Sequence, residues 1–380
     1  MNRIANKPSR ARAEDRILRA AIEVIVDDGV DGTTVGKVTD AALLTRPTFY
    51  AYFESVPGLL ASIWLTHGSQ WLHTVSDVST SVEETDPEGV RVFRALTEIF
   101  AVSHRIPEVL EVVRPTVIEW WQTVTDHGSF HAEKVSWWVS QRIGAVLTTP
   151  VDPDAEQSNI VLSMLASLPL VPSIPDGSVP AVDASSLDMF EPRGAKDIDE
   201  QMVLAAIGVI ASSGVRAASV ARIARRAKVS TATLYSRFPT IDVLVAASFD
   251  YAIRAVVGDN LQRLQETGSP QDFGRSMLTG LTPSRVTWRN FRTELHLEAR
   301  HRDVLAHQLS TSIRMANVLL MKNSVVLRQA PRAVAESLAY SVHCLAIGLS
   351  VLHNAGAPVG DLDHPRISVE MGSLLRSAPI

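Results

Sequence analysis

Residues 34–53 read TVGKVTDAALLTRPTFYAYF, and residues 219–238 read SVARIARRAKVSTATLYSRF. In each stretch apolar residues recur at helical spacing up to a short break. A hydroxyl residue, Thr45 or Ser230, then precedes a second short helical pattern, where its oxygen can cap free backbone amides. Each stretch therefore predicts two short helices joined by a tight turn, with the apolar residues facing a core.

The two stretches belong to a longer repeat. Residues 17–53 align without a gap with residues 202–238 at a constant offset of 185, and 12 of the 37 positions are identical. In the numbering of the first copy, these are Ala20, Ala21, Ile22, Val24, Ile25, Gly29, Val30, Val35, Ala42, Thr48, Tyr50 and Phe53. An added helix precedes each stretch and ends at a glycine, Gly29 or Gly214. The chain is therefore predicted to carry an internal duplication.

The face of each copy that does not pack inward is rich in hydroxyls, phenols and guanidinium groups. Such groups donate hydrogen bonds, which phosphate oxygens and acceptor atoms on base edges can accept. The candidate nucleic-acid contacts are Thr34, Lys37, Thr45, Arg46, Pro47, Thr48, Tyr50 and Tyr52 in the first copy, and Ser219, Arg222, Arg225, Arg226, Lys228, Ser230, Thr231, Thr233, Tyr235 and Arg237 in the second.

The pattern T/S-x-x-T-F/L-Y-x-x-F resembles the amino-terminal DNA-binding domain of TetR-type repressors. The duplication resembles the double-headed regulators of that family found in actinobacteria. The resemblance implies that Tyr50 and Tyr235 meet the DNA backbone. Two departures stand out: the lysine common three residues after the final phenylalanine is Val56 or Ile241 here, and Pro47 replaces a small residue in the first turn of the recognition helix, where proline is tolerated.

Basic residues are distributed unevenly between the copies. The net charge of −5 excludes a protein that binds polyanions through its overall charge, so local basic clusters must supply any contacts with nucleic acid. Residues 216–237 hold six basic residues and no acid, whereas in residues 31–52 Lys37 and Arg46 are balanced by two aspartates. The first copy has instead a basic tail with Arg3, Lys7, Arg10 and Arg12. We expect the second copy to supply most of the affinity, with Arg46 reading a base or, equally, contacting a phosphate.

The chain is predicted to be all-α, with two tandem units that each consist of a head and a helical body. The predicted domains are a first head with its basic arm (1–55), a first body (56–168), a proline-rich linker (169–195), a second head (196–240) and a second body (241–380). Beyond the heads, helices are predicted from Val56, then at 88–104, 107–127 with a break near Pro115, 130–147, 153–168, 241–265, 283–300, 304–327 and 331–352. No alternating strand pattern is present.

The bodies are expected to join the two units. In the resembling family, the last two body helices of each subunit form a four-helix dimer interface. Residues 331–352 and residues 153–172 match as the corresponding segments of the two halves. We therefore expect a monomeric chain folded as an intramolecular pseudo-dimer, with a dimer of such chains as the alternative.

Several function classes lack support in the sequence. The single cysteine, Cys344, allows no internal disulfide, the amino terminus lacks the apolar run of a signal peptide, and residues 337–353 are too short and polar for a membrane span. A cytoplasmic protein with no membrane association is expected. Glycine-rich phosphate loops and nucleophile motifs are absent, so the chain is predicted not to be an enzyme.

The bodies are expected to sense a small apolar or lipid-like effector, as the resemblance implies. A weak candidate pocket is formed by aromatic residues, namely Trp71, Trp120, Trp121, Trp137, Trp138 and Trp288. His127 and His131 stand four apart, but no carboxylate completes a ligand set, so neither a metal site nor a cofactor is predicted.

Together these observations predict a ligand-responsive repressor that places two recognition helices from one chain on one operator with two half-sites in double-stranded DNA. The alternative is a helical enzyme or scaffold with one functional head or none.

Overall fold

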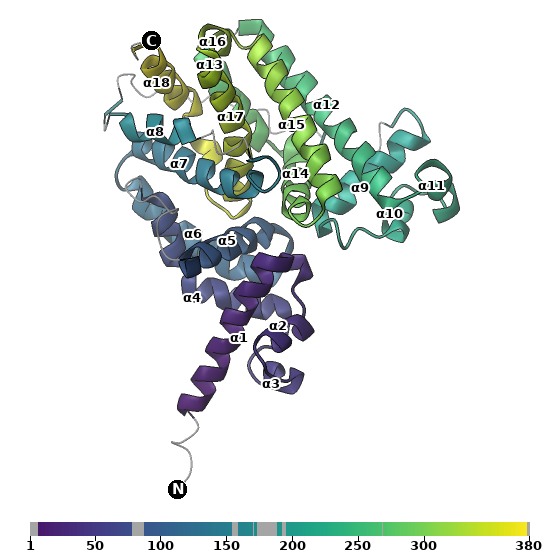
Figure 1. Cartoon of the computed structure of the whole chain (residues 1–380). Helices are drawn as coiled ribbons and strands as arrows, with labels where there is room; N and C mark the ends of the chain where they lie inside the picture. Colours follow the sequence, from purple (N-terminus) through teal and green to yellow (C-terminus); the bar gives the residue numbers. More distant parts are fainter. Residues whose placement is uncertain are drawn as a thin grey trace. The chain divides into compact units, whose positions relative to one another are not determined.

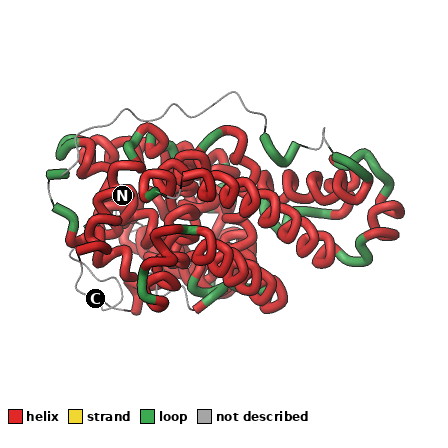
Figure 2. Tube along the Cα trace, turned by 90° about the horizontal axis from the view of Figure 1, so that it is seen from above, coloured by secondary structure: helices red, strands yellow, loops and turns green. Residues whose placement is uncertain are grey.

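A computed structural model describes residues 7–77, 87–153, 159–169, 171–172, 188–191, 195–267 and 269–377. Within these ranges the regular structure is entirely helical, and no strand is present (Figure 2). This confirms the predicted all-α class.

The chain divides into two compact units, which are described separately. The first comprises Met1–Gln122 with Asn354–Ala357. It contains α1 (Lys7–Asp28), η1 (Val30–Gly32), α2 (Val35–Ala41), α3 (Arg46–Tyr50), α4 (Val56–Ser76), α5 (Pro87–Val102), η3 (Ser103–Arg105) and most of α6 (Pro107–Thr125) (Figure 1).

The second unit comprises Thr123–His353 and Pro358–Ile380. Its helices are α7 (Ser129–Thr148), α8 (Asn159–Ser167), α9 (Ile198–Ser213), α10 (Val220–Arg226), α11 (Thr231–Arg237), α12 (Ile241–Thr267), α13 (Pro270–Leu281), η6 (Pro283–Arg285), α14 (Val286–Ala299), α15 (Asp303–Asn323), α16 (Val325–Gln329), α17 (Arg332–Asn354), η7 (Val359–Asp361) and α18 (His364–Ser377). Helices α7 and α8 precede the predicted linker in sequence, yet they pack in the same unit as the second head and body.

Some elements differ from the prediction. Helix α1 begins at Lys7, so Arg10 and Arg12 of the expected tail are helical, while Arg3 lies outside the described residues. Helix α6 continues through Pro115, because buried Val113 and Val117 hold it on both sides of the missing amide.

Helices α13 and α18 were not predicted. The proline-rich linker, 169–195, lies mostly outside the described residues, but one part of it is ordered by packing. Phe190 is 1% exposed and lies against Tyr251 and Trp288. The backbone of Met189 donates to Ser284, and that of Thr287 to Asp188. This part of the linker is therefore anchored in the core of the second body.

Two small-residue positions bring α7 and α17 into backbone contact. A Cβ atom at Gly144 would collide with the backbone of Cys344, and one at Gly348 would collide with that of Ser140. Ser140 and Gly144 lie 204 residues before Cys344 and Gly348, so the two pairs occupy equivalent positions on α7 and α17. Gly144 meets Cys344, which is the equivalent of Ser140, and Gly348 meets Ser140, which is the equivalent of Cys344. This reciprocal pattern is that of an isologous two-fold contact, formed here within one chain.

A buried ion pair joins α7 to α18. The guanidinium of Arg366 donates to both carboxylate oxygens of Glu133, at 2.9 and 2.5 Å, and also to Ser129. Burial raises the pKa of Glu133, and the hydrogen bonds from Arg366 oppose that rise. Since both side chains are almost fully buried, the pair fixes the position of α18 on α7.

One described helix, α17, is long and apolar enough to cross a membrane by those criteria alone. However, 67% of its most apolar window is buried in the protein. The core helix of a soluble protein has the same properties, so its composition is explained by packing.

Candidate nucleic-acid interface

Each head is a three-helix unit whose local geometry follows from capping residues at equivalent positions. Thr34 and Ser219 cap α2 and α10 by accepting the amide of the third residue on, and Thr45 and Ser230 cap α3 and α11 in the same way. The hydroxyl of each second cap also hydrogen-bonds a threonine of its helix, Thr48 at 2.9 Å or Thr233 at 2.7 Å. The caps therefore fix where each predicted recognition helix begins.

The turn between the two short helices is the same in both heads. Leu43 and Lys228 are the only described non-glycine residues with positive φ, at 51° and 54°, and they are 185 residues apart. This left-handed conformation reverses the chain sharply enough to set α3 and α11 at an angle to the helices before them. Both stretches therefore form a helix-turn-helix, as their sequences predict.

The inward face of each second helix packs as expected. Phe49, Phe53 and Leu234 are buried, and Phe238 is partly buried. The tyrosines beside them point outward, with Tyr50 58% and Tyr235 51% exposed. Their phenol groups are therefore free to meet an external partner.

Nearly all candidate DNA contacts lie at the surface. Thr48, Tyr52 and Thr233 are half-buried, and the other candidates are exposed, namely Thr34, Lys37, Thr45, Arg46, Pro47, Tyr50, Ser219, Arg222, Arg225, Arg226, Lys228, Ser230, Thr231, Tyr235 and Arg237. The two recognition helices differ in length, since α3 has 5 residues and α11 has 7.

The cations of the two heads differ in how they are held. Lys37 pairs with Asp28 at 3.2 Å, and Arg237 lies 3.5 Å from Asp199. Among the described residues, the charged groups of Arg225 and Lys228 form no ion pair.

Two other guanidinium groups lie over glycines. The end of the Arg226 side chain lies over Gly208 of α9, where a Cβ atom would displace it. In the first head, Arg46 lies beside Gly36 of α2. These glycines leave room for the arginine side chains on the surface of each head.

The six candidate pocket tryptophans occupy different surroundings. Trp71 lies in an aromatic cluster of the first unit, with its ring centroid 5.2 Å from that of Phe100 and 5.9 Å from that of Phe93. Trp120 and Trp121 are also buried in the first unit, with their ring centroids 5.8 Å apart. Trp138 is buried beneath Arg142.

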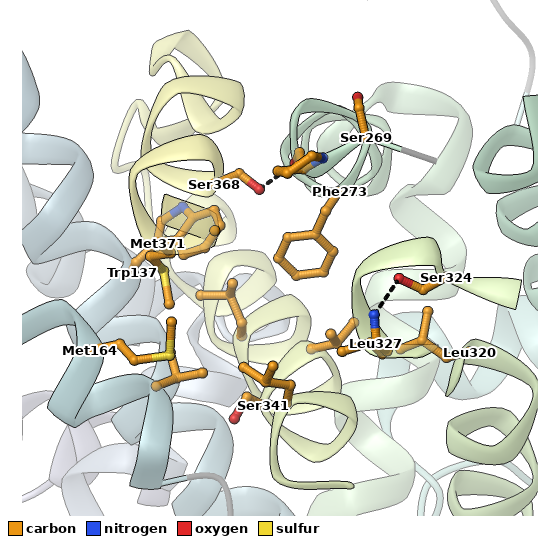
Figure 3. Close-up of a pocket in the computed structure, with 16 residues that line it drawn as sticks. Trp137, Met164, Ser269, Phe273, Leu320, Ser324, Leu327, Ser341, Ser368 and Met371 are labelled. Atoms are coloured by element: carbon orange, nitrogen blue, oxygen red, sulfur yellow. Dashed lines mark hydrogen bonds between the residues drawn. The ribbon is translucent and has the colours of Figure 1, made fainter. Parts of the chain in front are cut away.

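The remaining two tryptophans line cavities in the second unit. Trp137 lines an apolar cavity of about 90 Å³ bounded by α7, α8, α13, α15, α16, α17 and α18 (Figure 3). Trp288 lines a second cavity of about 150 Å³ bounded by α12, α13, α14, α15 and α17. Three arginines also line the second cavity, and the sequence prediction did not include them. Two of them, Arg289 and Arg292, lie on α14 at helical spacing from buried apolar residues. A charged residue on the core face of a helix requires an explanation, so this pattern could have revealed them.

The histidines considered as metal ligands are close together, with ring centroids 5.0 Å apart. His127 places one ring nitrogen 2.9 Å from the carbonyl of Thr123. No group of three potential metal ligands occurs among the described residues.

Comparison with known proteins agrees with the geometry of the heads. The model of the family "Bacterial regulatory proteins, tetR family" matches residues 17–63 and 203–248. An uncharacterized HTH-type transcriptional regulator of Mycobacterium tuberculosis is 36% identical over 66 residues, which are 17% of this chain and 35% of the relative. One from Mycobacterium bovis is 38% identical over 58 residues, which are 15% of this chain and 31% of the relative.

The chain thus spans about a third of the length of these curated relatives. The family is one of regulators rather than enzymes, in agreement with the prediction that the chain is not an enzyme. Both family matches fall on the two helix-turn-helix heads described above. The chain therefore carries the helix-turn-helix domain of the tetR family of bacterial regulatory proteins twice.

Proposed function

We propose that this protein is a transcriptional repressor whose helices α3 and α11 enter successive major grooves of one operator. The observation that carries this proposal is the equivalence of the two heads. Both have the same caps, the same left-handed turn and an exposed tyrosine at the same position. A turn that only connects two helices would need neither the paired hydroxyls nor the exposed phenols, whereas a DNA-binding surface uses both.

The heads contribute differently in this proposal. Arg225 and Lys228 are exposed and unpaired within the described part of the chain, so their full charge is available to phosphates. In the first head the charge of Lys37 is partly satisfied by Asp28. The second head then supplies most of the affinity, and the first adds register and sequence choice through Arg46.

The chain acts as an internal pseudo-dimer. The reciprocal contact of Gly144 with Cys344 and of Gly348 with Ser140 supports this assignment, because such a contact otherwise joins two identical subunits. One chain would then occupy a whole operator, and since the heads differ in sequence, the half-sites need not match.

The repressor responds to a small ligand held in the second unit. Its two cavities support this part of the proposal, because the larger one is lined by α12, which begins just after the recognition helix α11. A ligand that favours a different position of α12 would change the position of the second head and release DNA.

Selection of bound duplexes from a random DNA pool, followed by native mass spectrometry of the complex, tests the proposal. We expect a two-part site with half-sites about 34–36 Å apart, bound by one chain. Two chains per site would contradict the pseudo-dimer. Enrichment of a single half-site would show that only one head reads DNA, and no enrichment at low salt would overturn the function.

Arg46→Ala refines the test. Loss of preference at one half-site, with little change in overall affinity, is expected for a residue that reads a base. A uniform loss on every sequence would make Arg46 a phosphate contact instead.

A further inference from the structure

The cavity lined by Trp288 contains buried positive charge without matching acids. Arg285, Arg289 and Arg292 all line it, and none of its lining residues is acidic. Arg285 pairs with Asp259, but Arg289 and Arg292, 3% and 7% exposed, have no ion pair within the described residues. Burial of a charged group without a counter-charge is strongly unfavourable, so this arrangement requires an explanation.

The hydrogen bonds of the two arginines, both of which line the cavity, are incomplete. Arg289 donates to the carbonyls of Gly280 and Thr282, and Arg292 donates to the carbonyl of Ala346 and the hydroxyl of Ser350. The Nε atoms of both arginines remain buried without a partner. The amide nitrogen of Asn317, on the same cavity wall, is also buried and unpaired. Three buried donor groups therefore lack an acceptor.

Both arginines remain charged at neutral pH. Burial, with a contribution from neighbouring arginines, lowers the pKa of Arg292 to about 9, and burial lowers that of Arg289 to about 10. These values are still above 7, so the cavity keeps its positive charge. Among the described residues, the charge of Asp188, from the anchored part of the linker, opposes the lowering of the pKa of Arg289.

An apolar cavity adjoins the charged one. Phe273, Leu320 and Val342 line both cavities and form the wall between them. Figure 3 shows the ring of Phe273 projecting into the apolar cavity, opposite Met164 and Met371 on one side and Leu320 and Leu327 on the other. A charged compartment and an apolar compartment thus share a wall of apolar side chains.

The equivalent positions in the first unit are filled by large apolar side chains. The offset of 185 continues from the heads into α4 and α12, so Trp71 corresponds to Val256, which lines the charged cavity. Thr97 and Thr293 each donate to the carbonyl four residues earlier and are each followed by glutamate, which aligns α5 with α14 at an offset of 196.

By this alignment, Phe93 and Leu96 occupy the positions of Arg289 and Arg292. Both are buried, and the ring of Phe93 packs on Trp71. Large apolar side chains thus fill the first body where the second body has arginines and a cavity.

We propose that the second body, and not the first, binds an amphipathic anion, with its acidic group held by Arg289, Arg292 and Asn317 and its apolar tail passing Phe273 into the adjoining cavity. This inference rests on the proposed function, since it names the ligand that the repressor senses. A carboxylate is the simplest such group, because its two oxygens accept from both arginines and the amide together.

Calorimetric titration of the full chain, without DNA, tests the proposal. The probes are hexanoate, decanoate and tetradecanoate, with decanol as the uncharged counterpart of decanoate. At least one carboxylate should bind, and decanoate should bind more tightly than decanol. Arg292→Met should weaken carboxylate binding about thirtyfold or more and leave decanol unchanged. The matched control is Arg254→Met on α12, where the arginine side chain is 69% exposed and pairs with Asp250.

A second readout separates a ligand contact from a structural role. If Arg292 serves the ligand, Arg292→Met should raise the thermal midpoint of the ligand-free protein, because an unpaired buried charge is removed. If no carboxylate binds, or if Arg292→Met binds decanoate as the unmodified protein does, the proposal is overturned. Because these measurements contain no DNA, a carboxylate that binds but does not release the selected operator would contradict ligand-responsive repression and leave the assignment of the cavity intact.

Discussion

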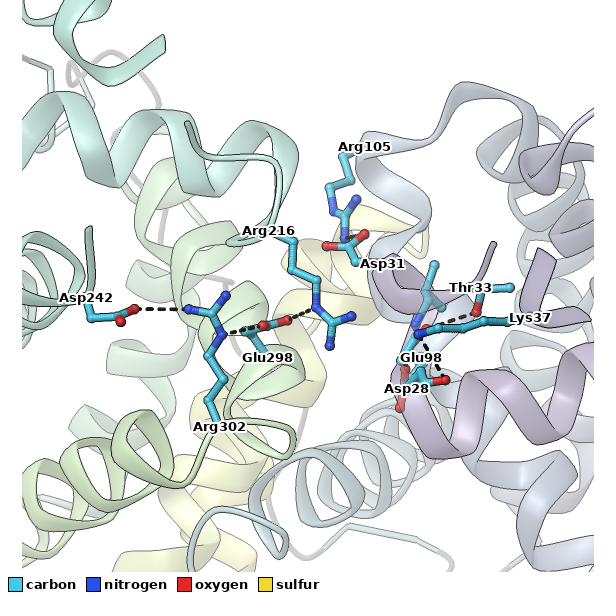
Figure 4. A network of polar contacts seen from close by, with 12 residues as sticks. Asp28, Asp31, Thr33, Lys37, Glu98, Arg105, Arg216, Asp242, Glu298 and Arg302 are labelled. Atoms are coloured by element: carbon cyan, nitrogen blue, oxygen red, sulfur yellow. Dashed lines mark hydrogen bonds and ion pairs between the residues drawn. The ribbon is translucent and has the colours of Figure 1, made fainter. Parts of the chain in front are cut away.

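Asp31 and Arg216 occupy the same position in the two heads, 185 residues apart, and carry opposite charges. Each pairs with its own body: Asp31 accepts from Arg105 at 2.8 Å, and Arg216 donates to Glu298 at 2.7 Å. Figure 4 shows both pairs, and it also shows Glu298 bonded to Arg302, which in turn reaches Asp242 at the start of α12. The two heads therefore bind their own bodies through charges of opposite sign at the same position.

The Arg216–Glu298 pair should couple the second head to its body. Arg216→Gln is expected to lower the free energy of unfolding by about 1 kcal/mol, because Glu298 is buried while Arg216 is partly exposed. A double-mutant cycle with Glu298→Gln, followed by urea denaturation, measures the coupling. Arg254→Gln, which breaks an exposed pair, should change the stability by less than about 0.5 kcal/mol and serves as the control. Additive effects of Arg216→Gln and Glu298→Gln would show that the pair carries no coupling.

The crossing of α7 and α17 should be intolerant of any side chain at its glycines. Gly348→Ala is expected to destabilise the protein by about 3 kcal/mol, since its Cβ would meet the backbone of Ser140 rather than a movable side chain. Gly258→Ala provides the control, because nothing lies within 4 Å of a Cβ built there. Removal of a glycine from the interior of α12 should stabilise the protein by about 0.5–1 kcal/mol. Equal thermal midpoints for the two variants would refute the close crossing.

Stability should fall in mild acid. Trp137 donates to Nδ1 of His364 at 2.7 Å, and Nε2 lies 2.7 Å from the carbonyl of Val359, so the neutral ring satisfies both contacts. Burial lowers the pKa of His364 to about 4 and that of His296 to about 4, from 6.5. The folded state therefore binds fewer protons than the unfolded state between these pH values. The stability is fully present above pH 6.5 and decreases toward pH 4.

The loss should amount to about 2 kcal/mol per histidine between pH 6.5 and pH 5. Urea denaturation across this range measures it. His364→Gln removes one titrating group, so its stability should depend less steeply on pH than that of the unmodified protein. A parallel dependence in both proteins would show that the pKa of His364 is the same in the folded and unfolded states.

The unpaired cations of the second head should set the salt dependence of DNA binding. Arg225→Ala is expected to weaken binding on every sequence and to reduce the slope of log affinity against log salt by about 1. Lys37→Ala should change the slope less, since Asp28 already shares that charge. Fluorescence anisotropy with the selected duplex at several salt concentrations measures this slope for each variant. An unaltered slope for Arg225→Ala would place its guanidinium away from the phosphates.

The heads could be predicted from the sequence because their structure is locally determined. Caps such as Thr45 and Ser230 and a core of residues at helical spacing act within a few turns of one another, and the family match confirms the result. Leu43 and Lys228 gave no such signal, since neither residue type favours a left-handed conformation. The surrounding helices impose it there.

The bodies were less predictable because their contacts join distant segments. Phe190 lies in a proline-rich stretch that reads as a linker, and only its contacts with Tyr251 and Trp288 bury it. A tryptophan looks the same in sequence whether it lines a cavity, as Trp288 does, or fills a core, as Trp71 does. The neighbours across the fold decide between these roles.

The reciprocal glycine contact also affects how this protein can change over evolution. In a homodimer each substitution is present in both subunits at once, so a mutation that fills one sensor pocket fills the other too. Here the two halves are encoded separately, and a change at Trp71 or Phe93 leaves Val256 and Arg289 as they were. The first half is thus free to become a scaffold while the second keeps its cavity, a division of labour open to a fused pair and closed to a symmetric one.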